Sequence, residues 1–327
     1  MLIRTDRIGD VILTLPMADA LRHNFPDAKI DFLVNTRTQE LVIDYPNINK
    51  VHAIEKDTIK DIKRILDENK YDLGIVVHPS YVIARALYKS KVKYRLGTAY
   101  RWYSFLFNLK HRQHRKDSIK HELEYNLDLL NELNCKPLKD LSPHIEVKKE
   151  AIDSLNNKLQ LKGIDLTRDY VVIHIPTLSS AKVWSDGNFV KLVDLILSDK
   201  ALNFDIILTG TKDNAAQVNN IMSKAGKNDR VFSVFDLNLR ELAALLKKAK
   251  LFIGNSSGPI HIAAAVETFV IGLYSPVKVE SPTRWGPYTE RKKIFVPAGD
   301  DNSRDVMDDI KPNEVFEFVK TFMLQRN

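Results

Sequence analysis

The sequence predicts an α/β protein made of two halves, each a doubly wound parallel sheet with helices on both faces. Short apolar runs alternate with helical patterns on either side of residues 136–150. Such alternation is typical of βαβ units on a parallel sheet. The chain of 327 residues is also long for one hydrophobic core, so two Rossmann-like domains of ~150 residues each are expected.

In the first half, the pattern predicts strands at residues 2–4, 29–34, 51–54, 72–77 and 93–96, and helices at 58–69, 81–88 and 120–133. The segment after the first strand has helical periodicity as far as Leu21. Pro16 lies inside it and should kink the helix, because proline has no N–H to donate.

Residues 136–150 contain two prolines and a charged run, which indicates a linker. Beyond it, strands are expected at 171–175, 204–208, 230–233, 251–253 and 269–274, and helices at 188–197, 215–225 and 239–248. The predicted division is an N-terminal domain at 1–145 and a C-terminal domain at 146–310. An amphipathic helix within 311–327 is expected to pack back toward the N-terminal domain.

Composition places the chain among soluble globular proteins, with 44% apolar and 28% charged residues. No apolar run approaches the ~18 residues of a membrane span, and no secretory leader is recognisable. The single cysteine, Cys135, excludes an internal disulfide and favours a cytoplasmic location. The net charge of +7 favours an anionic partner such as a nucleotide, a phosphorylated glycolipid or a membrane surface. Nucleic acid is disfavoured, since no recognition module accompanies the charge.

The most informative stretch is residues 251–265, where an apolar run ends in Gly254 and an Ala-rich helix follows a short turn. Proline is favoured at the first helical position, so Pro259 should begin the helix, with Gly258 as N-cap and Ser257 just outside. Free backbone N–H groups and the helix dipole would then meet at one point, which suits phosphate. The alternative is a tight turn with no ligand.

The same stretch matches G-x-S-x-G, the nucleophile elbow of α/β-hydrolases, with Ser256 as nucleophile. That fold needs an acid and then a histidine after the serine. His261 is the last histidine of the chain, and no acid lies between it and Ser256. A hydrolase triad is therefore excluded. His261 itself is either a binding-site residue or a buried helix histidine.

A Ser/Thr-rich loop with Thr177, Ser179 and Lys182 follows the first strand of the second half. A lysine at the carboxyl end of a strand could neutralise a departing diphosphate. Neither a G-x-G-x-x-G fingerprint nor a P-loop occurs in the chain. Because open parallel sheets bind ligands at the carboxyl ends of their strands, the site is expected in a cleft between the halves.

Two aspartates are candidates with competing interpretations. Asp10 follows Gly9 at the start of the first helix, where it is either a general base or an acid favoured by the helix dipole. Asp213 follows a strand of the second half and either binds ribose hydroxyls or caps the next helix. The histidines are scattered, and no metal-binding constellation is recognisable.

Residues 101–116 interleave aromatic and basic side chains. They could contact an acidic membrane surface or a phosphorylated acceptor. The alternative is a helix that buries its aromatics and is followed by a solvated basic loop.

With these stretches together, the chain resembles glycosyltransferase family 9, the bacterial heptosyltransferases of the GT-B fold. The resemblance covers most of the chain and is carried by four segments. These are Arg4-Thr-Asp-Arg-Ile-Gly-Asp10 with the residues up to Pro16, His78-Pro-Ser through Arg85 to Gly97, Ala181-Lys182-Val-Trp184, and Gly254-Asn-Ser-Ser-Gly-Pro-Ile-His261 with the alanines after it.

The resemblance implies an inverting, metal-independent transferase that moves a heptose or related sugar from a nucleoside diphosphate donor, ADP-heptose in the family, to a lipopolysaccharide core. No cofactor is implied. Asp10 would be the catalytic base and Lys182 the phosphate-binding lysine. The implied donor-binding residues are Gly9, Thr177, Ser179, Asp213, Ser256, Ser257, Gly258 and His261. The implied acceptor-binding residues are Arg85, Arg112, Arg115 and Lys116, on a protein peripheral to the inner membrane surface.

One position departs from the family. Ser256 stands where the family usually has an acidic residue. In the family, that residue looks like the group that binds the hydroxyls of the donor sugar. A hydroxyl bonds a sugar with roughly half the strength of a charge-assisted bond. Two alternatives therefore stay open: transfer of another sugar in capsule or O-antigen synthesis, and a catalytically silent protein that binds a nucleotide sugar.

Overall fold

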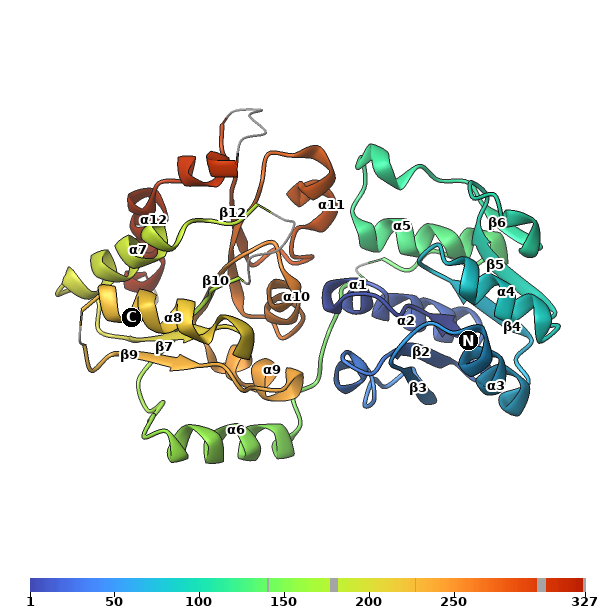
Figure 1. The fold of residues 1–327 in the computed structure, drawn as a ribbon, viewed down its shortest axis with the longest axis horizontal. Helices are drawn as coiled ribbons and strands as arrows, with labels where there is room; N and C mark the ends of the chain where they lie inside the picture. The colour runs from blue at the N-terminus through green and yellow to red at the C-terminus, as the bar shows by residue number, and fades with distance from the viewer. Residues whose placement is uncertain (140, 177–181, 227, 299–303, 326–327) are drawn as a thin grey trace. The chain divides into compact units, whose positions relative to one another are not determined.

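The computed structural model describes residues 1–327 apart from 140, 177–181, 227, 299–303 and 326–327. The chain divides into two compact units, Met1–Glu146 and Val147–Asn327. Each unit contains a six-stranded sheet whose paired strands run parallel, with helices packed on it (Figure 1). The predicted class of two doubly wound parallel sheets is confirmed.

The first sheet has the strand order β3-β2-β1-β4-β5-β6. Its strands are β1 (Leu2–Ile3), β2 (Asp31–Asn35), β3 (Lys50–Ile54), β4 (Leu73–Val76), β5 (Tyr94–Thr98) and β6 (Leu109–His111). The first strand is central, with Leu2 opposite Phe32 on one side and Ile75 on the other. The chain order therefore reverses at β1 and β4, and ligands of such sheets bind at the carboxyl end of this switch point.

The helices of the first unit are α1 (Ile8–Ile12), α2 (Leu15–Asn24), α3 (Ile59–Asn69), α4 (Tyr81–Lys89) and α5 (Glu122–Asp128), with 3-10 turns η1 (Gln39–Leu41), η2 (Ser104–Leu106), η3 (Arg115–Asp117) and η4 (Leu129–Leu133). Helix α3 packs beside α4, and α2 packs beside α5. The apolar faces of α3 and α4 join alternate strand residues, such as Ile3, Leu33 and Val76, in one core.

The predicted kink at Pro16 takes the form of a complete break. Helix α1 ends at Ile12 and α2 begins at Leu15, so Pro16 lies in the first turn of α2. Its missing N–H costs nothing there, because the first N–H groups of a helix have no intrahelical acceptor. The break is further fixed by Thr14, whose hydroxyl donates to the carbonyl of Asp10 at 2.8 Å.

The second sheet has the order β12-β11-β10-β7-β8-β9. Its strands are β7 (Tyr170–His174), β8 (Asp205–Thr209), β9 (Val231–Val234), β10 (Leu251–Asn255), β11 (Phe269–Leu273) and β12 (Lys292–Phe295). The first strand of this unit, β7, is again central, between β8 and β10. Both units thus have the same topology, and the second switch point lies at β7 and β10.

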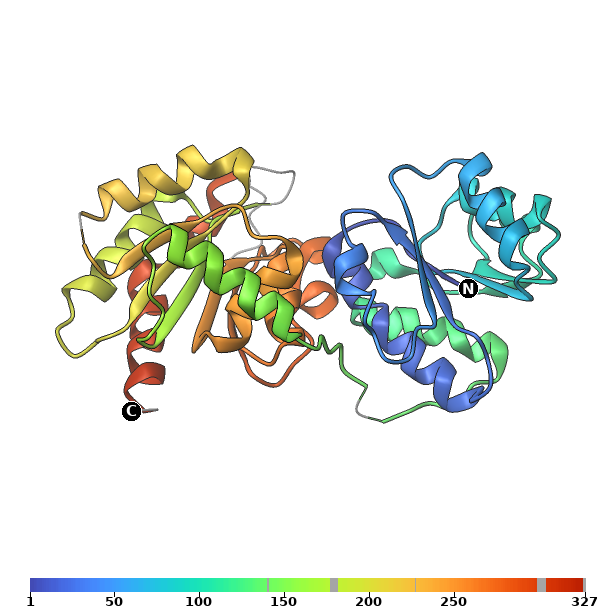
Figure 2. The ribbon, with the colours of Figure 1, turned by 90° about the horizontal axis from the view of Figure 1, so that it is seen from below.

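The helices of the second unit are α6 (Lys149–Leu161), α7 (Asp186–Ser198), α8 (Ala215–Lys224), α9 (Leu239–Lys248), α10 (Gly258–Ala265), α11 (Pro282–Trp285) and α12 (Pro312–Leu324), with 3-10 turns η5 (Lys212–Asn214), η6 (Lys278–Glu280) and η7 (Arg304–Asp309). Figure 2 shows α6, in green, across the face of this unit, and it packs beside α9. There Lys158 donates to Glu241 at 2.7 Å.

Several elements were not predicted from the sequence, among them β6, β12 and α6. Strands β6 and β12 are short, polar edge strands with little apolar alternation. Helix α6 starts inside the charged run of residues 136–150 that indicated a linker. It nevertheless buries Ala151, Leu155 and Leu159, which lie one helical turn apart.

The C-terminal helix packs in the core of the second unit, whereas the sequence predicts packing toward the N-terminal domain. Helix α12 lies beside α7, and its buried residues Val315, Val319 and Met323 belong to the core of the second unit. Phe322 packs on Phe269 of β11, with ring centroids 4.3 Å apart. The apolar stripe is thus used within its own unit, where an uncovered face of the sheet is available. Among the described residues, no helix is long and apolar enough to span a membrane.

Replacing Phe322 by Ala should lower the free energy of unfolding of the second unit by about 3–5 kcal/mol, the usual cost of removing a buried ring. Chemical denaturation followed by the fluorescence of buried Trp184 would measure it. Glu317→Ala, on the exposed side of α12, is the matched control. Equal stability of the two variants would contradict this packing.

Candidate functional site

The predicted donor turn joins the carboxyl end of β10 to α10. Ser257 is extended, with φ −149° and ψ 169°, and occupies the N-cap position. Helix α10 therefore begins at Gly258, and Pro259 is its second residue. The prediction of Gly258 as N-cap is off by one residue. The consequence for anion binding is unchanged, since the free N–H groups of the first helical turn still follow the strand end.

Two polar atoms at this turn are buried without a hydrogen-bond partner among the described residues: Oδ1 of Asn255 and Oγ of Ser257. Buried polar atoms are nearly always paired, so these two are available to a ligand. Beside them, Ser256 hydrogen-bonds Tyr274, whose pKa is raised by burial against the opposing effect of that serine. The Tyr274 hydroxyl donates to the carbonyl of Trp285 at 2.8 Å.

Lys182 is half-buried and follows the segment 177–181. Its loop is anchored by Trp184, which is fully buried and donates from Nε1 to the carbonyl of Ile310 at 2.8 Å. One residue on, the N–H of Ser185 donates to Asp308 at 3.1 Å. The predicted residues Thr177 and Ser179 lie outside the described residues.

His174, at the end of β7, was missed by the sequence reasoning. It is buried, its Nδ1 lies 3.1 Å from Oγ1 of Thr209, and burial lowers its pKa to about 4. It is therefore neutral at pH 7. Its place at the carboxyl end of the strand at the switch point is the signal that could have found it.

His261 is buried in the first turn of α10, and Asp213 is exposed in η5. The capping alternative for Asp213 does not hold, because Thr211 and Asn214 form the capping box of that turn. Roles of His261 and Asp213 in donor binding stay predictions.

In the first unit, Asp10 belongs to a buried ionic cluster around Arg4. Arg4 is 1% exposed and donates from Nε to Asp6 at 2.7 Å and from NH2 to Oδ1 of Asp10. Its NH1 also lies 3.4 Å from Oε1 of Glu122, at the start of α5. Gly9 is buried in α1 beside Asp10. The cluster lies where β1 ends, at the first switch point.

The neighbouring carboxylates raise the pKa of both Arg4 and Asp10. This favours the charged form of the arginine and the neutral form of the aspartate. Burial disfavours the charged guanidinium, but Asp10, Asp6 and Glu122 outweigh it and raise the pKa of Arg4, so the arginine keeps its charge. Burial raises the pKa of Asp10 to about 6 against the opposing effect of Arg4, and Asp6 and Glu122 contribute in the same direction as burial. Of these two groups, Asp10 is therefore the one that can gain or lose a proton near neutral pH.

A second residue at the same edge is His78, which follows β4. Its Nδ1 lies 3.4 Å from Oδ2 of Asp6, and its side chain is largely exposed. Burial lowers the pKa of His78, although Asp6 acts in the opposite direction. The sequence reasoning assigned it no role.

The four predicted acceptor residues differ in their surroundings. Arg112 and Lys116 are exposed. Arg85 donates to the hydroxyl of Tyr81 at 2.6 Å. Arg115 is directed inward, and donates to Glu122 at 2.5 Å and to Asn126 at 2.9 Å. These contacts make Arg115 part of the ionic cluster around Arg4, unlike the exposed Arg112 and Lys116.

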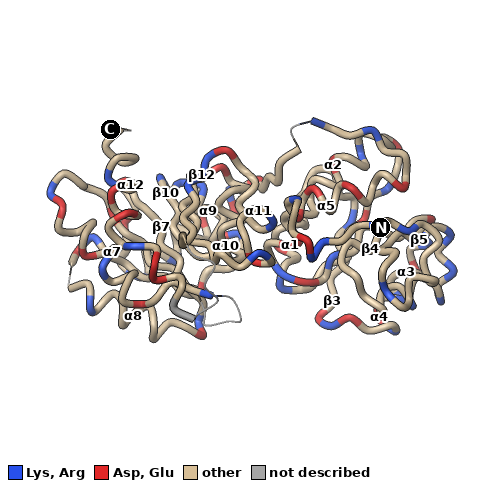
Figure 3. Tube along the Cα trace, turned by 90° about the horizontal axis from the view of Figure 1, so that it is seen from above, with Lys and Arg blue, Asp and Glu red and all other residues tan. Residues whose placement is uncertain are grey.

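The aromatic residues near 101–107 divide between core and surface. Tyr103 and Phe107 are buried, whereas Trp102 and Phe105 are 73% and 68% exposed. The segment forms η2 and then β6, so the alternative of a helix with inward aromatics is wrong. Lys and Arg occur in both units, interleaved with Asp and Glu along the chain (Figure 3).

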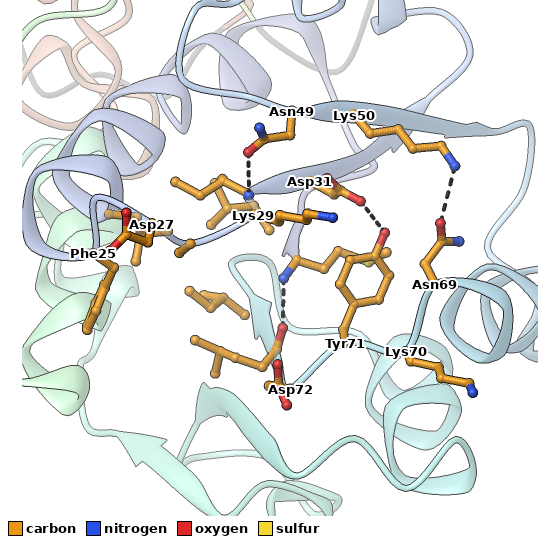
Figure 4. A pocket seen from close by; sticks show the side chains of 17 residues that line it. Phe25, Asp27, Lys29, Asp31, Asn49, Lys50, Asn69, Lys70, Tyr71 and Asp72 are labelled. Carbon is orange, nitrogen blue, oxygen red and sulfur yellow. Dashed lines mark hydrogen bonds between the residues drawn. The ribbon is translucent and has the colours of Figure 1, made fainter.

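A cavity of about 780 Å³ lies at the opposite edge of the first sheet, lined by residues at the amino ends of β1 to β4. Two pairs of its polar side chains are hydrogen-bonded: Tyr71 donates to Asp31 at 2.5 Å and Lys50 to Asn69 at 3.2 Å (Figure 4). None of the predicted site residues lines it. Among the described residues, no group of three or more His, Cys, Asp or Glu side chains is placed to hold a metal ion.

Comparison with known proteins adds a family and a set of related folds. The family model "Glycosyltransferase family 9 (heptosyltransferase)" matches residues 59–310. The chain is 27% identical over 328 residues to lipopolysaccharide heptosyltransferase 3 of Escherichia coli, covering 94% of this chain and 91% of that protein.

Two solved structures from E. coli share the fold. One is ADP-heptose lipopolysaccharide heptosyltransferase II, with a TM-score of 0.82, 18% identity and coverage of 99% and 98% of the two chains. The other is the heptosyltransferase WaaC with ADP, with a TM-score of 0.73, 18% identity and coverage of 98% of both chains.

Proposed function

Since this chain belongs to glycosyltransferase family 9, we propose that it moves a heptose or a related sugar from a nucleoside diphosphate donor to a lipopolysaccharide-core or similar glycan acceptor. That it is a glycosyltransferase follows from the family. The observation that carries the chemistry is Asp10, a buried carboxyl at the first switch point whose pKa of about 6 suits a general base at neutral pH.

The donor's diphosphate is assigned to the turn before α10. Backbone N–H groups of Ser257 and Gly258 lie at the positive end of the helix dipole, and the unpartnered Ser257 Oγ and Asn255 Oδ1 supply further polar contacts. ADP is the first candidate for the nucleotide, because the fold-related WaaC was solved with ADP. Lys182 would neutralise the diphosphate as it leaves.

The reaction is a single displacement. The acceptor hydroxyl gives its proton to Asp10, and its oxygen attacks the anomeric carbon from the face opposite the diphosphate. A new glycosidic C–O bond forms as the bond between the anomeric carbon and the phosphate oxygen breaks, so the configuration inverts. The nucleoside diphosphate leaves with the bonding electrons, and Lys182 and the turn N–H groups stabilise its charge. The protein cation takes the place of a metal.

Ser256 keeps the identity of the sugar open. It hydrogen-bonds Tyr274 and offers a donor sugar a hydroxyl in place of a carboxylate. This observation favours a second candidate, transfer of another sugar in capsule or O-antigen synthesis. A panel of ADP-sugars offered to one acceptor separates the two candidates.

The acceptor is proposed to be an anionic glycolipid at the inner face of the cytoplasmic membrane. Exposed Arg112 and Lys116 offer it two cations. Exposed Trp102 and Phe105 nearby in sequence provide side chains that partition into a membrane interface.

Thermal unfolding with a panel of nucleoside diphosphates and their sugars tests the donor site. ADP and ADP-heptose should stabilise the protein by about 2.7 kcal/mol at a hundred times Kd. Lys182→Ala should weaken this stabilisation, whereas the exposed Lys191→Ala on α7 should not. No stabilisation by any compound would mean that the turn before α10 binds no nucleotide.

Changing Asp10 to Asn should reduce turnover by at least about 100-fold, because the acceptor hydroxyl loses its general base. ADP stabilisation should survive the change, since Asp10 lies in the other unit from the donor turn. Asp27→Asn, an exposed aspartate of the same unit, is the matched control. Turnover of Asp10→Asn within a few-fold of the wild type would remove the base assignment.

The same assay tests metal independence. Excess EDTA should leave wild-type turnover unchanged, because Lys182 and backbone N–H groups are proposed to carry the leaving-group charge. Loss of activity with EDTA, restored by a divalent cation, would show that this part of the proposal is mistaken.

The acceptor assignment is tested by the double change Arg112→Ala and Lys116→Ala. Loss of charge-assisted bonds to an anionic acceptor should raise its KM about tenfold or more and leave the donor KM unchanged. Lys60→Ala with Arg64→Ala, an exposed pair on α3, is the charge-matched control. An unchanged acceptor KM would exclude this role.

A further inference from the structure

Three carboxylates surround Arg4, and they come from separate parts of the first unit. Asp6 lies in the loop after β1, Asp10 in α1, and Glu122 at the first position of α5. Glu122 is 118 residues from Arg4 in sequence and is fully buried. A buried carboxylate needs strong compensation, so its presence beside the Arg4–Asp10 pair calls for a reason.

Glu122 is held in place by Arg115, which is bonded to the same helix. Arg115 donates to its Oε1 at 2.5 Å. Asn126, one turn further along α5, accepts from Arg115 at 2.9 Å and donates to the carbonyl of Leu13 at 3.0 Å. Helix α5 is thereby bonded to Leu13, in the break between α1 and α2. Its N-terminus also favours a negative charge at Glu122.

Among the described ion pairs of Arg4 and Arg115, the carboxylates outnumber the guanidinium groups. Asp6, Asp10 and Glu122 supply three negative charges when ionised, whereas Arg4 and Arg115 supply two positive ones. His78, beside Asp6, has a lowered pKa and adds no positive charge at neutral pH. Arg4 is therefore shared among three acceptors, and Asp10 receives only part of its stabilisation.

We propose that Glu122, held by Arg115, is a positioning residue for Asp10. The Glu122 carboxylate competes with Asp10 for the guanidinium of Arg4 and repels negative charge on Asp10. Asp10 therefore stays basic enough to take the proton of the acceptor hydroxyl. This inference rests on the proposed function, in which Asp10 is the base. Arg4 fixes Oδ1 of Asp10, which leaves Oδ2 to receive the proton. In this role Arg115 acts through Glu122, to which it donates a hydrogen bond.

The test is the pH profile of kcat/KM for the full-length chain with Glu122→Gln. In the wild type, activity should fall below about pH 6, where Asp10 takes up a proton. Removing the charge of Glu122 leaves Arg4 more fully to Asp10, so the acid limb should move to lower pH by about one unit. The plateau kcat should fall about three- to tenfold, because a weaker base accepts the proton less readily, and the donor KM should not change.

Glu124→Gln is the matched control. It removes the same charge from the same helical turn at an exposed position, and glutamine can keep the capping-box bond to the N–H of His121. Its acid limb should coincide with that of the wild type. Glu122→Asp, which keeps the charge on a shorter side chain, should restore an acid limb close to the wild type.

A Glu122→Gln protein that melts like the wild type and keeps the wild-type acid limb would overturn the inference. If Glu122→Gln does not fold, Glu122→Asp decides: an acid limb moved by a unit or more despite the retained charge would contradict the proposed effect. If Asp10→Asn retained its turnover, Asp10 would not be the base and the proposed function would lose its mechanism. If Asp10→Asn were inactive but Glu122→Gln kept the wild-type acid limb, only the role of Glu122 would be rejected.

Discussion

The central strand of each parallel sheet is the constraint on which the sites depend. Strands β1 and β7 are covered by helices on both faces and flanked by strands on both sides, so their residues must be apolar until the strand ends. Arg4 follows β1 directly, and His174 is the last residue of β7. Polar side chains of these segments are therefore found at the carboxyl ends of the strands, where the strand order reverses. The cavity at the amino edge of the first sheet also contains polar groups, among them the hydrogen-bonded pairs Tyr71–Asp31 and Lys50–Asn69.

The ionic cluster at the first edge contains buried charges whose desolvation lowers the stability of the fold. Buried ion pairs seldom stabilise a fold beyond what packed apolar side chains would provide. Here a guanidinium is shared by three carboxylates, and the pKa of Asp10 lies at about 6 as a result of burial and of its acidic neighbours. Apolar residues in the same volume would pack as well and could hold no proton. The arrangement is consistent with the proposed proton transfer to Asp10.

The second edge is built differently. His174 is neutral because burial lowers its pKa to about 4, and the turn before α10 contributes backbone N–H groups and unpartnered oxygens. Such a site offers a dianion fixed dipoles, supplemented by the lysine of the loop that Trp184 anchors. The proposed proton transfer in one unit and the proposed diphosphate binding in the other would assign one substrate of the transfer to each unit.

The sequence by itself determined the class of fold, the division into two units, the turn at residues 254–261 and the candidacy of Asp10. These depend on local periodicity and on residues adjacent in the chain. It did not reveal the edge strands β6 and β12, whose polar residues lack an alternating pattern, or α6, whose start lies in a charged run. It also did not show that α12 packs in the core of the second unit, because an amphipathic stripe shows that a helix is covered without showing which surface covers it. The partners that Arg4 finds on α5 were decided by tertiary structure alone. Glu122 and Asn126 reach Arg4 only because α5 packs beside α2, and a contact across more than a hundred residues leaves no mark on the sequence near either end.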